Sequence, residues 1–547
     1  MEKMLMFLPA LVVAMAVAGC TSAPRQQTAS GDAAAPPSRR PLKVFILVGQ
    51  SNMQGHARVT TFDHIGMDPK TAPMLEDMRN ADGAPVVLDD VYISAIGIGK
   101  EGEVKGKLAA EYGARGRGDK IGPEYTFGIY MHKALEEPFL IIKTAWGGKS
   151  LSFDFRSPSA GEWTPPPGHP DLIKEEPEPL PIPDALDIPA DYKPGREHLN
   201  PYARHLGFFM FKGLRGCAIG EHNGVHPIYI VQDAKHAERQ EAFPLKTGDV
   251  IVGIEGSGMK ENPKDHWRKV VYGDVTQSDC MLTVARWRAG RIESIDIDLA
   301  DFSLPGGRAD LPREREKAEQ RRLEHEKDKG RYYRLMMDHV KKVLGDIKRV
   351  CPDYDPQRGH EIAGFVWFQG WNDMVDSGTY PNRDKPRGYE QYSWLLAHFI
   401  RDVRKDLGAP DMPFVIGVMG VDGPDEEGGG KGFFRDAMAA PAGYPEFKGT
   451  VAAVHTEEYW DKQLAELKDR DYKAGMKAKE FQLKDGLSGD EFKKAVAEYR
   501  ATVFTPEEEE ILRKGVSNAG FHYLGSAKIM GQIGRGFAEA MLDLIED

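Results

Sequence analysis

The stretch Lys43-Val-Phe-Ile-Leu-Val-Gly-Gln-Ser-Asn-Met53 decides the fold class predicted for this chain. Residues 44–48 are all apolar and include three β-branched side chains, which predicts a short strand buried on both faces of a sheet. Gly49 and Gln50 end the strand, and Ser51 follows. Because ligands of open α/β sheets bind beyond the carboxyl ends of the strands, Ser51 stands where a site is expected.

Four further apolar runs have the length and composition of buried strands. They span residues 138–145, 362–368, 413–421 and 451–454. The first is closed by Trp146-Gly-Gly148 and the second by Gln369-Gly370. Amphipathic helical patterns, including residues 389–407, lie between the runs. This alternation predicts an α/β fold with a mostly parallel sheet.

Composition limits the classes of function. The 547 residues are 41% hydrophobic and 29% charged, which is a globular composition, and this length is usual for several domains. Lys and Arg number 72 and Asp and Glu 84, so a net charge of −12 leaves no global basic footprint for nucleic acid. Four cysteines are too few for a disulfide scaffold, although a Cys217–Cys280 disulfide is compatible with an oxidising compartment.

The N-terminal segment has the pattern of a targeting sequence. Lys3 precedes a mostly apolar run, residues 4–18, that is shorter than the ~20 residues of a membrane span and fits a signal peptide or a short anchor. Val17-Ala-Gly-Cys20 resembles a bacterial lipobox. The resemblance implies a cleaved signal peptide over residues 1–19, lipidation of Cys20, and a flexible tether over residues 20–40. It places the chain outside the cytoplasm on a lipid anchor, and Thr21 favours the outer membrane of a two-membrane cell.

The middle of the chain differs in composition from its flanks. Residues 151–200 hold 11 of the 37 prolines, which predicts an extended connection. Residues 310–345 predict a helix that is broken at Gly330 and carries an apolar face in its second half. Residues 457–514 predict a second charged helical segment. We expect the charged side chains of both segments to face solvent.

Residues 201–303 predict a small, mainly β insertion. Phe243-Pro-Leu-Lys-Thr-Gly-Asp-Val-Ile-Val-Gly-Ile-Glu-Gly256 and the hairpin over residues 281–299, with its Ala-Gly turn, together resemble a bacterial PDZ domain. Gly213-Leu-Arg-Gly216 stands about where that family has its carboxylate-binding loop. The resemblance implies peptide binding by strand addition, with a purely structural insertion as the alternative.

Ser51 is the first candidate for chemistry. A nucleophilic serine needs a base within reach and N–H groups for the oxyanion. Met53 takes the place of the second glycine of a Gly-x-Ser-x-Gly elbow, so that motif is absent. From the local sequence alone, Ser51 also fits the N-cap of a helix.

Four blocks in order resemble the sialate O-acetylesterase-like family, which includes the family-six carbohydrate esterases of the SGNH hydrolases. They are residues 44–53, Trp146-Gly-Gly-Lys-Ser150, Val366-Trp-Phe-Gln-Gly-Trp-Asn-Asp373 and Phe521-His-Tyr-Leu-Gly525. The resemblance implies a three-layer α/β/α, flavodoxin-like domain over residues 41–200 and 304–547. It makes Ser51 the nucleophile and His522 the general base. It also assigns the oxyanion hole to the N–H groups of Ser51 and Gly148 and the side chain of Gln369.

One departure concerns the acid that supports the histidine. Many relatives place it three residues before the histidine, where this chain has Ala519 with Asn518 beside it. Some relatives carry a carboxylate in the third block instead, where Asp373 is the nearest equivalent. We therefore predict Asp373 as the triad acid, with a Ser–His dyad or a backbone carbonyl that orients His522 as alternatives.

The sequence contains no metal-ligand spacing and no nucleotide or phosphate fingerprint, which predicts chemistry without a cofactor. The resulting hypothesis is a lipid-anchored serine esterase that removes acetyl groups from carbohydrate. A substrate sugar would pack on Trp146, Trp367 or Trp371. A non-catalytic glycan-binding scaffold with a peptide-docking insertion, and an esterase of non-sugar esters, are the alternatives.

Overall fold

A computed structural model of the chain describes residues 40–99, 102–115, 119–172, 326–424, 429–483 and 485–546. Between 172 and 326 it describes residues 182, 208–209, 214–222, 226–234, 249–254, 257–258, 281–298, 320 and 323. The predicted signal peptide, Cys20 and nearly all of the tether lie outside the described residues. The described residues from Leu42 onward belong to one compact unit.

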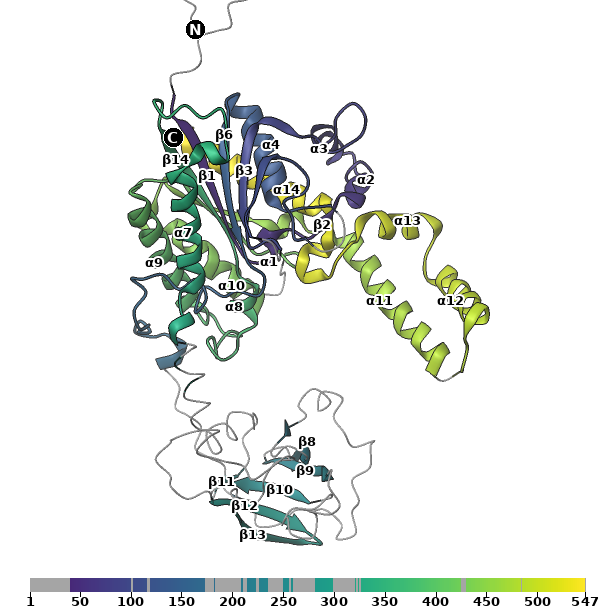
Figure 1. Cartoon of the computed structure of the whole chain (residues 1–547). Coiled ribbons are helices and arrows are strands. Elements are labelled where there is room, and N and C mark those ends of the chain that lie inside the picture. Colours follow the sequence, from purple (N-terminus) through teal and green to yellow (C-terminus); the bar gives the residue numbers. More distant parts are fainter. Residues whose placement is uncertain are drawn as a thin grey trace, which may run out of the picture. The chain divides into compact units, whose positions relative to one another are not determined.

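A seven-stranded sheet forms the centre of this unit, and β1 (Leu42–Gly49) is its middle strand (Figure 1). The strand order is β16-β15-β14-β1-β6-β3-β4. All neighbouring strands are parallel except β4, which is antiparallel to β3. The remaining strands are β3 (Leu88–Ile96), β4 (Val104–Leu108), β6 (Phe139–Ala145), β14 (His360–Phe368), β15 (Phe414–Val418) and β16 (Val451–His455).

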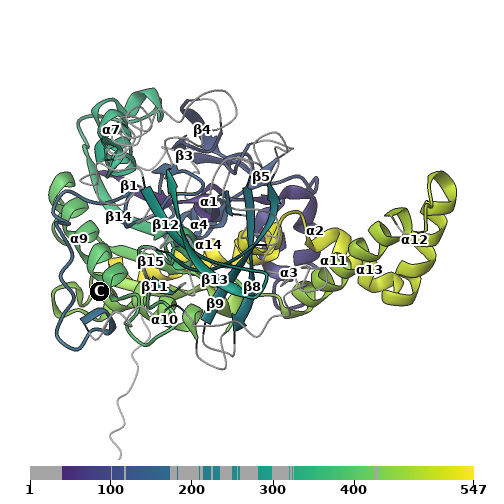
Figure 2. The same ribbon diagram turned by 90° about the horizontal axis from the view of Figure 1, so that it is seen from below.

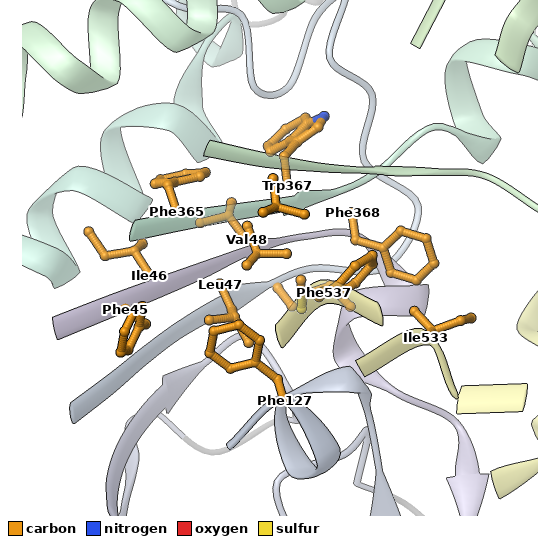
Figure 3. Packing of buried hydrophobic residues seen from close by; sticks show 14 of the residues in the cluster. Phe45, Ile46, Leu47, Val48, Phe127, Phe365, Trp367, Phe368, Ile533 and Phe537 are labelled. Atoms are coloured by element: carbon orange, nitrogen blue, oxygen red, sulfur yellow. The ribbon is translucent and has the colours of Figure 1, made fainter. Parts of the chain in front are cut away.

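Helices cover both faces of the sheet, which makes three layers. Phe45 of β1 packs edge-on against Phe127 of α4 (Pro123–Leu135), and Phe368 of β14 packs against Phe537 of α14 (Ala527–Glu546). On the other face, Trp367 contacts Phe399 of α9 (Glu390–Leu407), which also contacts α7 (Arg331–Gly345). Figure 3 shows Phe45, Phe127 and Phe537 on one side of β1 and Trp367 on the other. The α/β fold class predicted from the sequence is confirmed.

The five predicted strands all form, although β15 ends at Val418 rather than at residue 421. Two strands of this sheet, β3 and β4, were not predicted from the sequence. Asp89 and Asp90 at the start of β3 obscure its apolar run, and only Val91–Ile96 pair with β6. β4 is an edge strand with alternating exposure and too few apolar residues to stand out.

The other helices and a two-residue strand pair complete the unit. Two strands, β2 (Ala57–Arg58) and β5 (Lys120–Ile121), pair antiparallel beside the site described below. The helices are α1 (Ser51–Gln54), α2 (Phe62–Ile65), α3 (Ala72–Met78), α8 (Trp371–Val375), α10 (Gly430–Ala439), α11 (Lys462–Leu483), α12 (Gly489–Val503) and α13 (Pro506–Gly515). Figures 1 and 2 both show α11, α12 and α13 side by side.

The predicted helix at 310–345 is confirmed in its second half. Gly330 precedes α7 with φ +68°, a left-handed conformation that breaks the helical path. Tyr333, Met336 and Val340 form its buried face. Leu335, an apolar residue of the same half, lies outside this buried face and is 37% exposed.

The described strands of the insertion form a separate antiparallel sheet in the order β13-β12-β10-β9-β8-β7, with β11 paired to β10. The β12–β13 hairpin turns at Ala289 and Gly290, whose φ values of 48° and 83° suit a two-residue hairpin turn. Leu214–Gly216 belong to β8 rather than to the predicted loop. The strands are β7 (Phe208–Phe209), β8 (Leu214–His222), β9 (His226–Ala234), β10 (Val250–Ile254), β11 (Ser257–Gly258), β12 (Met281–Arg288) and β13 (Arg291–Asp298). The PDZ-like identity stays a prediction.

Two further features concern the helices and the cysteines. Among the described residues, no helix combines the length and apolar character that a membrane crossing requires. Cys351 is a buried free thiol. Cys280 lies outside the described residues, so the Cys217–Cys280 disulfide stays a prediction.

Candidate active site

Three of the predicted blocks follow three neighbouring strands. β1 lies between β6 and β14, and Gly49 pairs with Ala145 on one side and Phe368 on the other. Since the strands are parallel, the residues that follow them leave the sheet at the same edge. Ser51, the Gly147-Gly148 pair and Gln369 therefore gather at the carboxyl edge of the sheet, where α/β folds bind ligands.

Ser51 begins the short helix α1. Gln50 occupies the N-cap position and no side chain caps the helix, so the interpretation of Ser51 as an N-cap residue is wrong. Gly49 allows the turn that leads to Ser51, because a Cβ there would lie 2.0 Å from the carbonyl oxygen of Phe368. No hydrogen bond is found for the Ser51 hydroxyl among the described contacts, which leaves its oxygen free for substrate.

The glycine pair after β6 lies against the serine. A Cβ on Gly147 would be 3.7 Å from the Ser51 Cβ and 3.0 Å from Gln54 Oε1. Gly148 has φ +72°, and its Cα faces open space, with no atom within 4 Å of a Cβ built there. The loop thus brings a backbone segment close to Ser51 without a side chain at Gly148.

His522 lies in a tight turn, Gly520–Gly525, which packs against α1 and β2. Tyr523 and Leu524 both have left-handed backbone conformations, with φ 51° and 60°. Such strain persists only where the surroundings hold it. Here the buried Tyr523 hydroxyl accepts the Gly420 N–H at 2.8 Å and lies 2.8 Å from Thr456 Oγ1.

The imidazole of His522 has two neighbours that sequence reasoning did not assign to the site. Its Nδ1 lies 3.0 Å from Asn518 Oδ1. Its ring stacks on His56, with centroids 3.8 Å apart and planes 4° from parallel. Burial and then the Lys120 ammonium lower the pKa of His522 to about 4. Burial, with the charges of His522 and nearby lysines, lowers the pKa of His56 to about 3.

Asp373 is not brought to His522. Its fully buried carboxylate accepts the N–H groups of Leu151 at 2.7 Å and Ser152 at 3.0 Å, the Gln369 amide at 2.7 Å and the Tyr380 hydroxyl at 2.9 Å. Burial raises the pKa of Asp373. All four partners are donors, however, so the ionised carboxylate is the form that these contacts fit. The contacts of Asp373 hold the loop after Gly148, and the atom that faces His522 Nδ1 is the oxygen of Asn518.

Gln369 is likewise committed to internal contacts. Its Nε2 lies within 3.1 Å of Gln50 Oε1, Lys149 O and Asp373 Oδ2, and its Oε1 accepts the Tyr392 hydroxyl at 3.0 Å. An amide nitrogen has two hydrogens, which these three acceptors already occupy. Gln369 therefore holds the carbonyl of Lys149 in place. In this arrangement its amide has no free hydrogen for an oxyanion, which its predicted role as a direct donor would require.

Of the three tryptophans considered for sugar binding, Trp371 is joined to the histidine through Phe521. Its ring is 5.8 Å from that of Phe521, which is 44% exposed and contacts the His522 ring at 4.4 Å. Trp367 is wholly buried in the core, and Trp146 packs against Phe155 and Tyr332. Trp371 and Phe521 are called the aromatic pair below.

A buried ion pair stabilises the C-terminal end of α1. Lys143 of β6 and Glu124 of α4 are both fully buried, with Nζ and Oε2 2.5 Å apart. Lys143 Nζ also donates to the carbonyls of Gln54 at 3.1 Å and Tyr112 at 2.9 Å. All three ammonium hydrogens are used, and one of them holds the end of the helix that carries Ser51. A lysine within the apolar run 138–145 is the sequence signal that indicates a buried carboxylate as its partner.

The chain is similar to two solved structures, an X-ray structure of a protein from Arabidopsis thaliana and a carbohydrate acetylesterase from Xanthomonas citri. The first shows 12% identity and a TM-score of 0.29 and covers 76% of this chain and 86% of the other. The second shows 9% identity and a TM-score of 0.26 and covers 75% of this chain. This chain spans about half of the second protein, 49% of its length. The comparison with curated proteins returned no match.

A family model gives the most informative similarity. The model described as "Carbohydrate esterase, sialic acid-specific acetylesterase" matches residues 41–161 and 321–453. The two segments hold Ser51, Gly148, Gln369 and Asp373, whereas His522 and the inserted sheet lie outside them. Over these segments the chain is similar to the carbohydrate esterases of that family.

Proposed function

We propose that this protein is a serine esterase that hydrolyses acetyl esters of carbohydrates. The Ser51 hydroxyl oxygen attacks the acetyl carbonyl while His522 Nε2 takes the hydroxyl proton. The tetrahedral intermediate then collapses, the bond to the sugar oxygen breaks, and that oxygen receives the proton from His522. Water, deprotonated by His522, releases acetate from Ser51 and restores the enzyme.

The proposed oxyanion donors are the backbone N–H groups of Ser51 and Gly148. Ser51 opens α1, so its N–H has no partner within the helix. Gly148 belongs to a loop that packs on Ser51 through Gly147. Preorganised donors of this kind stabilise the developing oxyanion by about 3 kcal/mol each. Gln369 and Asp373 contribute by holding the loop.

The observation that carries the proposal is the contact between α1 and the Gly520–Gly525 turn. It brings a serine hydroxyl without a hydrogen-bond partner and a histidine whose Nδ1 is engaged to the same edge of the sheet. The described hydrogen bonds include none between Ser51 and His522, and such catalytic hydrogen bonds are commonly loose until substrate binds.

The central experiment compares the hydrolysis of p-nitrophenyl acetate by the wild-type protein and by Ser51→Ala. We expect Ser51→Ala to lose activity by at least 1,000-fold, because removing the nucleophile of a serine hydrolase costs up to about 10⁶ in kcat. Ser488→Ala, at an exposed N-cap that makes no side-chain hydrogen bond, is the matched control and should retain full activity. Full activity in Ser51→Ala would overturn the proposal.

The aromatic pair supports a carbohydrate as the substrate. Sugar rings pack on exposed aromatic faces, and such contacts contribute about 1 kcal/mol. Trp371→Ala should lower kcat/KM about fivefold to tenfold more on acetylated xylo-oligosaccharides than on p-nitrophenyl acetate. Tyr472→Ala, a 66% exposed aromatic on α11, is the control. An equal loss on both substrates would assign Trp371 to the architecture of the site instead.

We also propose that the protein is anchored through lipidated Cys20, outside the cytoplasm and in the outer membrane where the cell has two. The lipobox-like Val17-Ala-Gly-Cys20 supports this proposal. Metabolic labelling with an alkyne fatty acid should mark the wild-type protein and leave Cys20→Ala unmarked. Equal labelling of both proteins would contradict it.

A further inference from the structure

We propose that Asn518 and His56 together replace the triad acid, as an uncharged clamp that fixes the tautomer and the ring plane of His522. This inference rests on the proposed esterase function. It makes Asn518 and His56 positioning residues, since both act on the reaction through His522.

The backbone determines which way the Asn518 amide faces. Its Oδ1 lies 2.7 Å from the backbone nitrogen of Ala519, which can only donate. The atom that accepts this bond must be the amide oxygen. The same oxygen lies 3.0 Å from His522 Nδ1, so Nδ1 carries the proton and the Nε2 lone pair is free to act as the base.

This fixed orientation separates the site from a triad in which the acid is simply replaced by its amide. In serine proteases such a replacement costs about 10⁴ in kcat because the histidine adopts the wrong tautomer. Here the Ala519 N–H prevents the amide from turning its nitrogen toward His522. An asparagine can thus perform the orienting part of the acid's role, although it supplies no negative charge.

His56 completes the clamp on the other side. The Asn518 Nδ2 lies 3.4 Å from His56 Nδ1, which must then be the acceptor and leaves the proton on His56 Nε2. That Nε2 is buried and has no hydrogen-bond partner among the described residues. A buried unpaired N–H is costly, so His56 is not explained by its own hydrogen bonding. Its parallel stack on the His522 ring, with centroids 3.8 Å apart, gives it a positioning role.

Lys120 of β5 lowers the pKa of both His522 and His56, and Lys143 of β6 lowers that of His56. Lys143 is itself paired with the buried Glu124 carboxylate at 2.5 Å. Among the described contacts, His522 Nδ1 faces an amide oxygen rather than a carboxylate. His522 should therefore remain a neutral base well into acidic solution.

Asn518 variants test the clamp through kcat, KM and the pH dependence of p-nitrophenyl acetate hydrolysis. Asn518→Ala should lower kcat at least 100-fold and change KM less than threefold. Asn518→Asp adds the missing charge, and His56 can accommodate it by moving its proton to Nδ1. The acid limb of kcat/KM should then move up by at least one pH unit. Wild-type kcat in Asn518→Ala, or an unmoved limb in Asn518→Asp, would overturn the proposal.

His56 variants separate stacking from hydrogen bonding. His56→Phe keeps an aromatic ring beside His522 and should retain kcat within about fivefold, whereas His56→Ala should lose at least tenfold. An equal loss in both variants would refute the role of the stack. Thermal unfolding of each variant identifies losses that come from unfolding.

A measurement without substrate distinguishes failure of the clamp from failure of the esterase proposal. In ¹⁵N-histidine-labelled protein, the His522 signal, assigned by its absence in His522→Gln, should report a protonated Nδ1. In Asn518→Ala the signal should shift toward the mixed tautomers of free histidine. The clamp is contradicted if His522 carries its proton on Nε2 in the wild type, whatever the activity. An inactive wild type with a protonated Nδ1 would count against the esterase alone.

Discussion

Replacing Asp373 tests whether this carboxylate holds the Gly148 loop or orients the histidine. The carboxylate is fully buried and accepts four hydrogen bonds, from Leu151, Ser152, Gln369 and Tyr380. A hydrogen bond to a charged group contributes about 1.5–3 kcal/mol. In Asp373→Ala the four donors lose their acceptor together, which amounts to about 6–12 kcal/mol and is comparable to the whole stability of a typical domain.

Asp373→Asn is therefore the more informative variant. Its amide oxygen can keep the Leu151 and Gln369 contacts at the Oδ2 position. The new NH₂ group then faces the Ser152 N–H and the Tyr380 hydroxyl, of which only the hydroxyl can rotate to accept. One buried N–H is left unpaired and the remaining bonds lose their charge, so we expect a loss of about 3 kcal/mol.

Urea unfolding followed by tryptophan fluorescence measures this loss, and Asp490→Asn, at a side chain that is 99% exposed, is the matched control. The kcat of Asp373→Asn should fall because the loop that carries Gly148 loosens. The acid limb of its pH profile should stay where it is, since no contact joins Asp373 to His522. A stability within about 0.5 kcal/mol of the wild type, or a shifted acid limb, would refute this reasoning.

Three further predictions follow from buried groups. Lys143→Met leaves Glu124 as a buried charge without its partner and should lower the free energy of unfolding in urea by about 3–5 kcal/mol. Adding Glu124→Gln in a double variant should restore part of this loss. An unchanged unfolding midpoint in Lys143→Met would contradict the importance of the ion pair. Gly49→Ala places a Cβ 2.0 Å from a carbonyl oxygen and should lower stability by about 3 kcal/mol, whereas Gly161→Ala, with open space around it, should be nearly neutral. The folded-state pKa values of His56 and His522, about 3 and about 4, lie below the usual 6.5, so the unfolded chain binds more protons. The stability that these two histidines contribute should be fully present above pH 6.5 and should be lost as the pH drops toward 4 and then 3. In His56→Phe the Tm should depend less on pH over this range. A Tm that rises on acidification would contradict the prediction.

Much of the site was accessible from the sequence because it follows from strand ends. The apolar run before Ser51 and the runs before Gly148 and Gln369 predict buried parallel strands, and all three strands form as neighbours. Parallel strands release their next residues at one edge, so local patterns were sufficient to place a site at the strand ends, whereas the roles of the blocks came from the family resemblance. The PDZ-like insertion, the Cys20 anchor and the Cys217–Cys280 disulfide remain predictions from local patterns.

Which residue faces which atom was decided by the tertiary structure. The resemblance to the esterase family suggested Asp373 as the partner of His522, because some relatives carry a carboxylate in the third block. The fold instead uses Asp373 to bind the loop after β6 and turns Asn518 toward Nδ1, with its oxygen fixed by the Ala519 N–H. His56 could not be found from the sequence, since its stack on His522 joins segments at opposite ends of the chain. Periodicity and turn residues act over a few positions and so determine elements and their edges. Hydrogen-bond partners at a site depend on distances of a few tenths of an ångström between distant segments, and only packing of the whole chain determines those.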